Sequence, residues 1–304
     1  MRRMLGLAIV CLMAVPASAA TLDGSIVGDG YSTRALQTIQ TGFGGGFNEL
    51  AGAYANVEGG NLNIAITGKI EAFNKLMLFI DTGAGGENVL TRSTGSGGSN
   101  VASDGWADKM GTSPDVPGFK FDAGISPNYL LLSRAGFDGI DKFDFNFSSV
   151  GSTAVDEATF DIFGGSQTGA NASVGASGIG VAFDDSQTGG SIGGSAGDPA
   201  VSPGSVTSGL EFVIPLTAIG SPNLADIKAT AFLNNGGFDF AANQTLGGLP
   251  LGFGNLGGDG FGGTGHIDLS AYSGDQFFIV PEPASVVLAG LALAGLVVSG
   301  RRRM

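Results

Sequence analysis

Glycine is the feature that most restricts how this chain can fold. It fills 55 of the 304 positions, and 11 more are proline. Both residues are poor helix formers, and no amphipathic stretch of ten or more residues with helical spacing occurs between them. Only 13 % of the residues are charged while 43 % are hydrophobic, the reverse of the balance that keeps a chain disordered. The sequence therefore favours a β protein with many loops around an ordinary core.

The clearest strand signal lies between residues 49 and 70. Side chains alternate with a period of two over residues 50–57 and again over residues 62–70, and Glu58-Gly59-Gly60-Asn61 separates the two runs. This arrangement is typical of a β-hairpin. Residues 76–80 are apolar without interruption, which predicts a strand buried on both faces.

Shorter strand signals follow along the rest of the chain. We expect strands at residues 119–123, 129–134, 143–148, 159–163, 179–183, 210–214, 226–233, 266–269 and 276–280, with one helical turn within 215–220. The glycine- and serine-rich stretches 94–99 and 164–197 are expected to be surface loops. Many short strands separated by turns are typical of a sandwich or barrel. We predict an all-β chain whose body, residues 21–279, is a single jelly-roll-like β-sandwich.

Residues 1–20 have the three parts of a secretory signal peptide. A basic start (Met1-Arg2-Arg3) precedes an apolar segment, and the small residues of an A-x-A cleavage site follow: Ala17, Ala19 and Ala20. We expect signal peptidase to cut after Ala19 or Ala20. Cys11 is the only cysteine and lies in the apolar segment, so the exported chain would contain neither a disulfide nor a thiol.

The C-terminal residues 280–304 have a distinctive order. Pro281-Glu282-Pro283 precedes an apolar run over residues 284–300, and Arg301, Arg302 and Arg303 follow. The run predicts a short transmembrane helix, and the arginines would stay on the cytoplasmic side. This tail closely resembles the PEP-CTERM sorting signal. The resemblance implies recognition by an exosortase, transient anchoring in the inner membrane of a Gram-negative bacterium, and release to the cell surface or extracellular matrix.

The body carries a second resemblance. Residues 53–66 form an early hairpin, an apolar strand ends at Asp81, and residues 209–216 read Gly-Leu-Glu-Phe-Val-Ile-Pro-Leu. This order resembles the DOMON-like sandwiches that include family 9 carbohydrate-binding modules. The resemblance implies a sandwich fold and a carbohydrate ligand, for which exopolysaccharide is the candidate.

The charge of the body restricts its partners. Without the two terminal segments it holds 9 basic and 26 acidic residues, a net charge of −17. Such a surface repels nucleic acid and anionic lipid. We therefore expect no nucleic-acid partner, and a protein that is either soluble outside the cell or recruits cations.

Asp81 is the main candidate for chemistry, and three interpretations of it stay open. Asp81-Thr82-Gly83 follows an apolar strand and resembles the active-site turn of aspartic proteases, which need two carboxylates sharing one proton. No second Asp-Thr-Gly or Asp-Ser-Gly occurs, so catalysis would require a dimer. Asp81 could instead cap a tight glycine turn. Asp81 and Glu87 are also candidate calcium ligands, because calcium takes carboxylate oxygens from loops.

These observations favour an exported, non-enzymatic cell-envelope or extracellular-matrix protein that is sorted by an exosortase. We expect no cofactor other than the candidate calcium ion. The alternative is a secreted hydrolase, dimeric and aspartic-protease-like, that uses Asp81. A passive matrix protein without a specific ligand is a third hypothesis.

Overall fold

The predicted hairpin is present in the computed structural model. β2 (Glu49–Glu58) and β3 (Asn61–Lys69) pair antiparallel. Gly59 and Gly60 connect them with φ angles of +59° and +84°, which glycine adopts without steric cost. The structure describes residues 20–43, 48–70, 74–83, 85–91, 106–137, 140–150, 158–160, 171–174, 177–184, 186, 194–258, 260 and 262–280.

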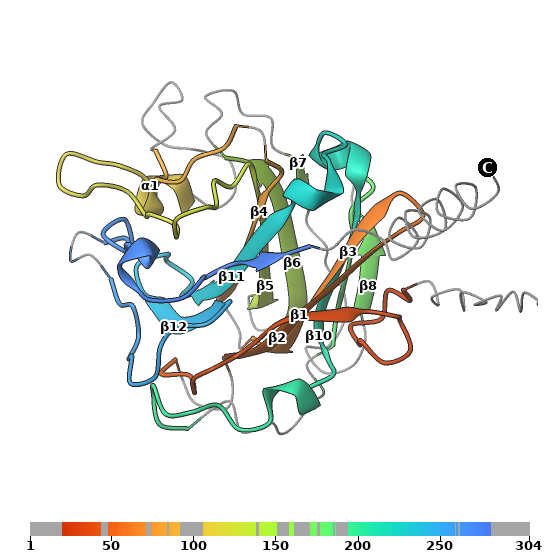
Figure 1. Cartoon of the computed structure of the whole chain (residues 1–304), viewed down its shortest axis with the longest axis horizontal. Coiled ribbons are helices and arrows are strands. Elements are labelled where there is room, and N and C mark those ends of the chain that lie inside the picture. The colour runs from red at the N-terminus through yellow and green to blue at the C-terminus, as the bar shows by residue number, and fades with distance from the viewer. Residues whose placement is uncertain are drawn as a thin grey trace, which may run out of the picture.

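The hairpin belongs to the first of two antiparallel sheets (Figure 1). This six-stranded sheet has the order β1-β2-β3-β10-β9-β8. Its other strands are β1 (Ser32–Leu36), β8 (Asn171–Val174), β9 (Gly180–Phe183) and β10 (Gly209–Pro215).

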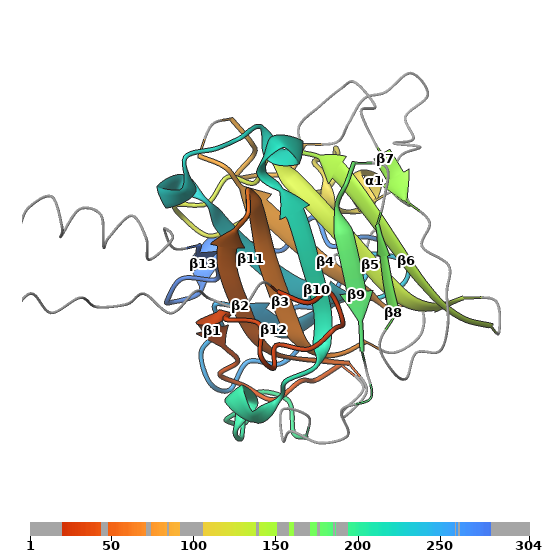
Figure 2. The same cartoon turned by 90° about the vertical axis from the view of Figure 1, so that its right-hand side faces the viewer.

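The second sheet has the order β12-β11-β4-β5-β6-β7, and β13 also pairs with β11. In Figure 2 its strands lie behind β2, β3 and β10. The strands are β4 (Lys75–Asp81), β5 (Tyr129–Phe137), β6 (Ile140–Ser149), β7 (Ala158–Phe160), β11 (Lys228–Asn234), β12 (Ala241–Leu246) and β13 (Phe278–Ile279). The helical segments described are α1 (Trp106–Met110) and the 3₁₀ turns Pro203–Ser205, Leu216–Ile219, Leu224–Asp226 and Leu269–Ala271. The chain is thus an all-β sandwich, as predicted.

The main core fills the space between the sheets. Alternate residues of the facing strands supply it, including Ile64 of β3, Phe212 of β10, Leu78 of β4 and Ala231 of β11. Because side chains of a strand alternate between its two faces, the residues between these positions point away from this core. On the first sheet that outer face carries the acidic residue described below.

A second core explains why residues 76–80 of β4 are apolar without interruption. Phe79 points away from the main core and packs against Trp106 of α1, Phe121 and Phe232, with ring centroids 4.8 to 6.0 Å apart. Every residue of β4 is buried. The prediction of a strand covered on both faces is confirmed.

Two predicted strands are wrong. Residues 119–123 and 266–269 are loops that cross the outer side of the second sheet, and the two are joined by one isolated bridge, between Lys120 and Asp268. Alternating apolar residues such as Phe119 and Phe121 are typical of a strand with one buried face. Here these two rings are buried because they pack on β4 and β11, and their segment pairs with no strand. The helical turn predicted within residues 215–220 is present.

Four elements carry no recognisable sequence signal. They are β1, α1, β8 and β12. β8 lies in the stretch 164–197, which was predicted to be loop apart from a strand at residues 179–183, so that prediction is corrected there. β12 reads Ala-Ala-Asn-Gln-Thr-Leu and is buried throughout. Its Asn243 and Gln244 side chains satisfy neighbouring backbone groups, a role that hydrophobic patterning does not reveal.

Both predicted export segments fall mostly outside the described residues. These do not include Ala17, Ala19 or any residue after Val280, so Pro281, Glu282, Pro283 and the three terminal arginines are not described. In the part of the chain that is described, no helix is long and apolar enough to cross a membrane.

Candidate functional site

Glu211 is the acidic residue that the first sheet places on its outer face. Its neighbours Leu210 and Phe212 belong to the main core, so the Glu211 side chain points the other way. It is nevertheless only 1 % exposed, because the N-terminal loop (residues 20–31) crosses this face of β10. A carboxylate is rarely buried to this extent unless the structure gives it partners.

Backbone contacts hold the N-terminal loop against β10. Ser25 forms an antiparallel bridge with Ser208, and the Gly209 N–H donates to the Gly24 carbonyl at 2.9 Å. Gly24 has a φ of +82°, and a Cβ atom there would lie 2.6 Å from the Asp184 nitrogen. Glycine at this position therefore permits both the turn and the close approach to the strands.

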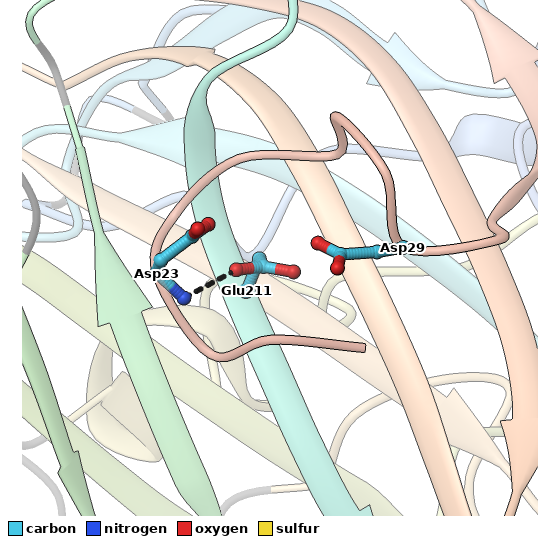
Figure 3. A group of neighbouring side chains, drawn as sticks. All are labelled: Asp23, Asp29 and Glu211. Atoms are coloured by element: carbon cyan, nitrogen blue, oxygen red, sulfur yellow. Dashed lines mark hydrogen bonds between the residues drawn. The ribbon is translucent and has the colours of Figure 1, made fainter. Parts of the chain in front are cut away.

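Three donors from the same loop satisfy the Glu211 carboxylate. Oε2 accepts the N–H groups of Asp23 and Gly24 at 2.9 and 2.6 Å, and Oε1 accepts the Tyr31 hydroxyl at 2.8 Å. Figure 3 shows the bond from the Asp23 nitrogen. Burial raises the pKa of Glu211, and the nearby Asp29 charge adds to that effect, whereas these hydrogen bonds oppose it.

Asp29 approaches Glu211 from the other end of the loop. Its side chain is 3 % exposed, and Oδ1 accepts the Thr21 N–H at 2.9 Å. The second oxygen, Oδ2, is buried without a hydrogen-bond partner. In Figure 3 the Asp29 carboxylate is directed toward Glu211, on the side opposite to Asp23.

Asp23, Asp29 and Glu211 together form an acidic cluster. One carboxylate oxygen from each residue lies within 4.8 Å of the others. Carboxylate oxygens are the ligands preferred by hard divalent cations. Within the described residues, this cluster is the group of acidic side chains whose geometry fits a shared metal ion.

Sequence reasoning missed this cluster because its members are far apart in the chain. Asp23 and Glu211 are 188 positions apart, and no motif connects them. One signal was available: Glu211 interrupts a strand whose other residues are mostly apolar, in the sequence Leu-Glu-Phe-Val-Ile.

The structure places the predicted residues Asp81 and Glu87 in local turns. Asp81 Oδ1 accepts the Gly83 N–H at 2.7 Å, and Oδ2 accepts the Ser126 N–H at 2.8 Å. Both Glu87 oxygens accept hydrogen bonds from Thr91. Turn capping accounts for the contacts with Gly83 and Thr91, whereas the Ser126 bond joins Asp81 to a segment 45 positions away. A calcium ion shared by Asp81 and Glu87, and an active site at Asp81, stay predictions.

Comparison with known proteins identifies the C-terminal segment. Residues 280–303 match the family model of the PEP-CTERM protein-sorting motif. No curated protein and no solved structure matched the chain, so the DOMON-like resemblance stays a prediction. The matched residues include Pro281, Glu282, Pro283 and the three arginines. The chain therefore carries a PEP-CTERM protein-sorting motif, which indicates export and exosortase-mediated sorting to the surface or beyond.

Proposed function

We propose that the β-sandwich is a non-enzymatic domain of the cell envelope or extracellular matrix that contacts exopolysaccharide. The observation that carries the proposal is the sorting motif at residues 280–303. Exosortase sorting would deliver the sandwich to the surface or extracellular matrix, where secreted polysaccharide is a candidate ligand. The signal peptide at residues 1–20 and transient anchoring through residues 284–300 belong to the same proposal.

Partly exposed aromatic rings on the second sheet support a carbohydrate contact. Phe240, which directly precedes β12, is 38 % exposed, and Phe253 in the loop after β12 is 39 % exposed. Phe253 packs edge-on against Tyr272, with ring centroids 5.0 Å apart. A ring held by a second ring is a preformed apolar surface, on which the apolar face of a sugar ring can stack.

Binding of the full chain to the host's own purified exopolysaccharide tests this proposal. We expect saturable binding that weakens when Phe253→Ala removes the exposed ring. Val201→Ala is the matched control, because Val201 is 50 % exposed and is not aromatic. Absence of binding by the wild-type chain would reject the carbohydrate contact and favour a passive matrix role.

The hydrolase alternative makes a separate prediction. If Asp81 is a catalytic carboxylate, Asp81→Asn abolishes hydrolysis of protein substrates while the chain remains folded. We expect no hydrolysis by the wild-type chain, because both Asp81 oxygens already accept backbone hydrogen bonds, from Gly83 and from Ser126. Hydrolysis that disappears in Asp81→Asn would overturn the non-enzymatic proposal.

A further inference from the structure

We propose that Asp23, Asp29 and Glu211 form a calcium site that fastens the N-terminal loop to β10. This inference does not depend on the proposed function, because it rests on the geometry of three carboxylates and not on the ligand of the sandwich. Two of the residues come from one short loop and the third from a strand of the sheet. An ion bound to all three would connect the loop to the sheet directly.

The spacing of the oxygens fits a calcium ion. Calcium–oxygen distances are about 2.3–2.6 Å, so two ligands on opposite sides of the ion are separated by about 5 Å. One oxygen from each carboxylate lies within 4.8 Å of the others, which is inside that limit. Magnesium requires about 2.0–2.1 Å and a nearly ideal octahedron, so it would need the three carboxylates to close further around it.

Asp29 Oδ2 is the independent observation that points to a ligand. The Asp29 side chain is 3 % exposed, yet this oxygen has no hydrogen-bond partner. A buried carboxylate oxygen without a donor loses its hydration and gains nothing in return. Its carboxylate is directed toward Glu211 (Figure 3), so a cation between the two would supply the missing partner.

The charges at the site need compensation. Asp29 and Glu211 are both nearly fully buried, and Asp23 is half-buried. In the described part of the chain, no ammonium or guanidinium group forms an ion pair with any of the three. Like charges held this close repel one another. A divalent cation would offset that repulsion, and the all-oxygen ligand set favours a hard ion over zinc or copper.

The rival source of positive charge is the chain's own α-amino group. The Thr21 nitrogen donates to Asp29 Oδ1 at 2.9 Å. Signal-peptide cleavage after Ala20 would convert this amide into an ammonium group beside the cluster. The experiment must therefore distinguish an added metal ion from a processed N-terminus.

Thermal unfolding of the full-length chain, first stripped of metal with a chelator, separates these sources. We expect calcium chloride to raise the Tm by about 5 °C, since a ligand that binds only the folded state stabilises it. Calorimetric titration should show one calcium ion per chain at this site, and an equal concentration of magnesium should raise the Tm much less. Absence of a calcium-dependent shift would overturn the proposal. If the Tm did not respond to calcium but rose when the chain was cleaved after Ala20, the result would favour the α-ammonium group of Thr21.

Asp29→Asn is the decisive variant. It keeps an oxygen to accept the Thr21 N–H and replaces the unpartnered oxygen by an amide of the same shape. We expect it to abolish the calcium-dependent shift while leaving the metal-free Tm unchanged or higher, because one repelling charge is removed. Asp115→Asn, a change at an exposed carboxylate elsewhere, should retain the full shift. A persistent shift in Asp29→Asn would show that calcium binds elsewhere and would overturn the assignment.

Terbium provides a readout that does not depend on stability. This ion substitutes for calcium and luminesces when a nearby tyrosine absorbs light. The Tyr31 hydroxyl lies 2.8 Å from Glu211 Oε1, so we expect sensitised emission that calcium displaces and that Tyr31→Phe reduces several-fold. Emission unchanged in both Tyr31→Phe and Asp29→Asn would place the bound ion away from the cluster.

Discussion

Tyr31 and Glu211 are 180 positions apart in the sequence, and the hydroxyl of the first donates a 2.8 Å hydrogen bond to the carboxylate of the second. Burial raises the pKa of Tyr31, and the Glu211 charge raises it further, so the tyrosine remains a donor at any physiological pH. This pair joins the end of the N-terminal loop to the middle of β10. It complements the two backbone hydrogen bonds that the other Glu211 oxygen accepts from Asp23 and Gly24.

Tyr31→Phe should therefore destabilise the fold. Removing the hydroxyl leaves a buried carboxylate oxygen with one donor fewer, which costs about 1–3 kcal/mol. Urea denaturation of the wild type and the variant measures the difference. Tyr272→Phe is the control, because Tyr272 is only partly buried on the second sheet, and we expect a smaller change there.

The stability of the chain should fall between about pH 4.5 and pH 7 because of Glu49. Burial raises the pKa of Glu49 from 4.5 to about 7, although its cross-strand neighbour Lys69 lowers it in part. In this window the folded state binds more protons than the unfolded state, so stability is lost as the pH rises through it. The loss is at most about 3–4 kcal/mol, at about 1.4 kcal/mol for each pKa unit.

Glu49→Gln removes that titration. Glu49 is 7 % exposed, and its Oε2 is buried without a hydrogen-bond partner. We expect the variant to be more stable than the wild type at pH 8 and to show a flatter pH profile between pH 4.5 and 7 in thermal unfolding. An unchanged profile would mean that Glu49 titrates normally.

Gln244→Leu should be strongly destabilising even though leucine is more hydrophobic. The Gln244 amide accepts the Leu50 N–H at 2.7 Å and donates to the Ile39 carbonyl at 3.0 Å. Leucine would leave both backbone groups buried and unpaired, at about 1–3 kcal/mol each. Denaturant unfolding should show a loss several times that of Asn223→Leu, an amide-to-leucine change at an exposed position.

Gly68→Ala tests the close contact of the β2–β3 hairpin. Gly68 has a φ of +142°, and a Cβ atom there would lie 2.1 Å from the Glu49 carbonyl oxygen. Neither the strain nor the clash can be relieved without moving β2, so we expect a loss of at least about 2 kcal/mol. Gly254→Ala is the matched control, since nothing lies within 4 Å of that position, and its Tm should stay close to the wild type.

Replacing Pro281, Glu282 and Pro283 by alanine should block sorting without affecting the fold. These residues lie within the matched motif and follow the last described strand, β13, in the sequence. We expect most of the variant to remain in the membrane fraction of the host, while the wild type reaches the surface or medium. Asp275→Ala, an exposed change just before β13, should be sorted normally. Normal sorting of the triple variant would show that the exosortase reads other residues.

The central strands β2, β3 and β4 were predictable because their patterns depend only on neighbouring residues. The alternation of β2 and β3 and the unbroken apolar run of β4 follow from burial on one or both faces. Phe119 and Phe121 show where this reasoning fails. A buried apolar residue looks the same in sequence whether pairing or packing buries it, and here loops pack these rings on the outside of the second sheet.

The sequence alone determined the sorting signal and the β class of the body. The sorting signal is a contiguous segment that an enzyme reads as such, and the β class follows from abundant glycine and short period-two runs. Only the tertiary structure assembled the acidic cluster. Its residues become neighbours because the N-terminal loop crosses the outer face of β10, and no local pattern encodes a contact between residues 188 positions apart. Local interactions determine the elements, whereas long-range packing decides which charged groups those elements bring together.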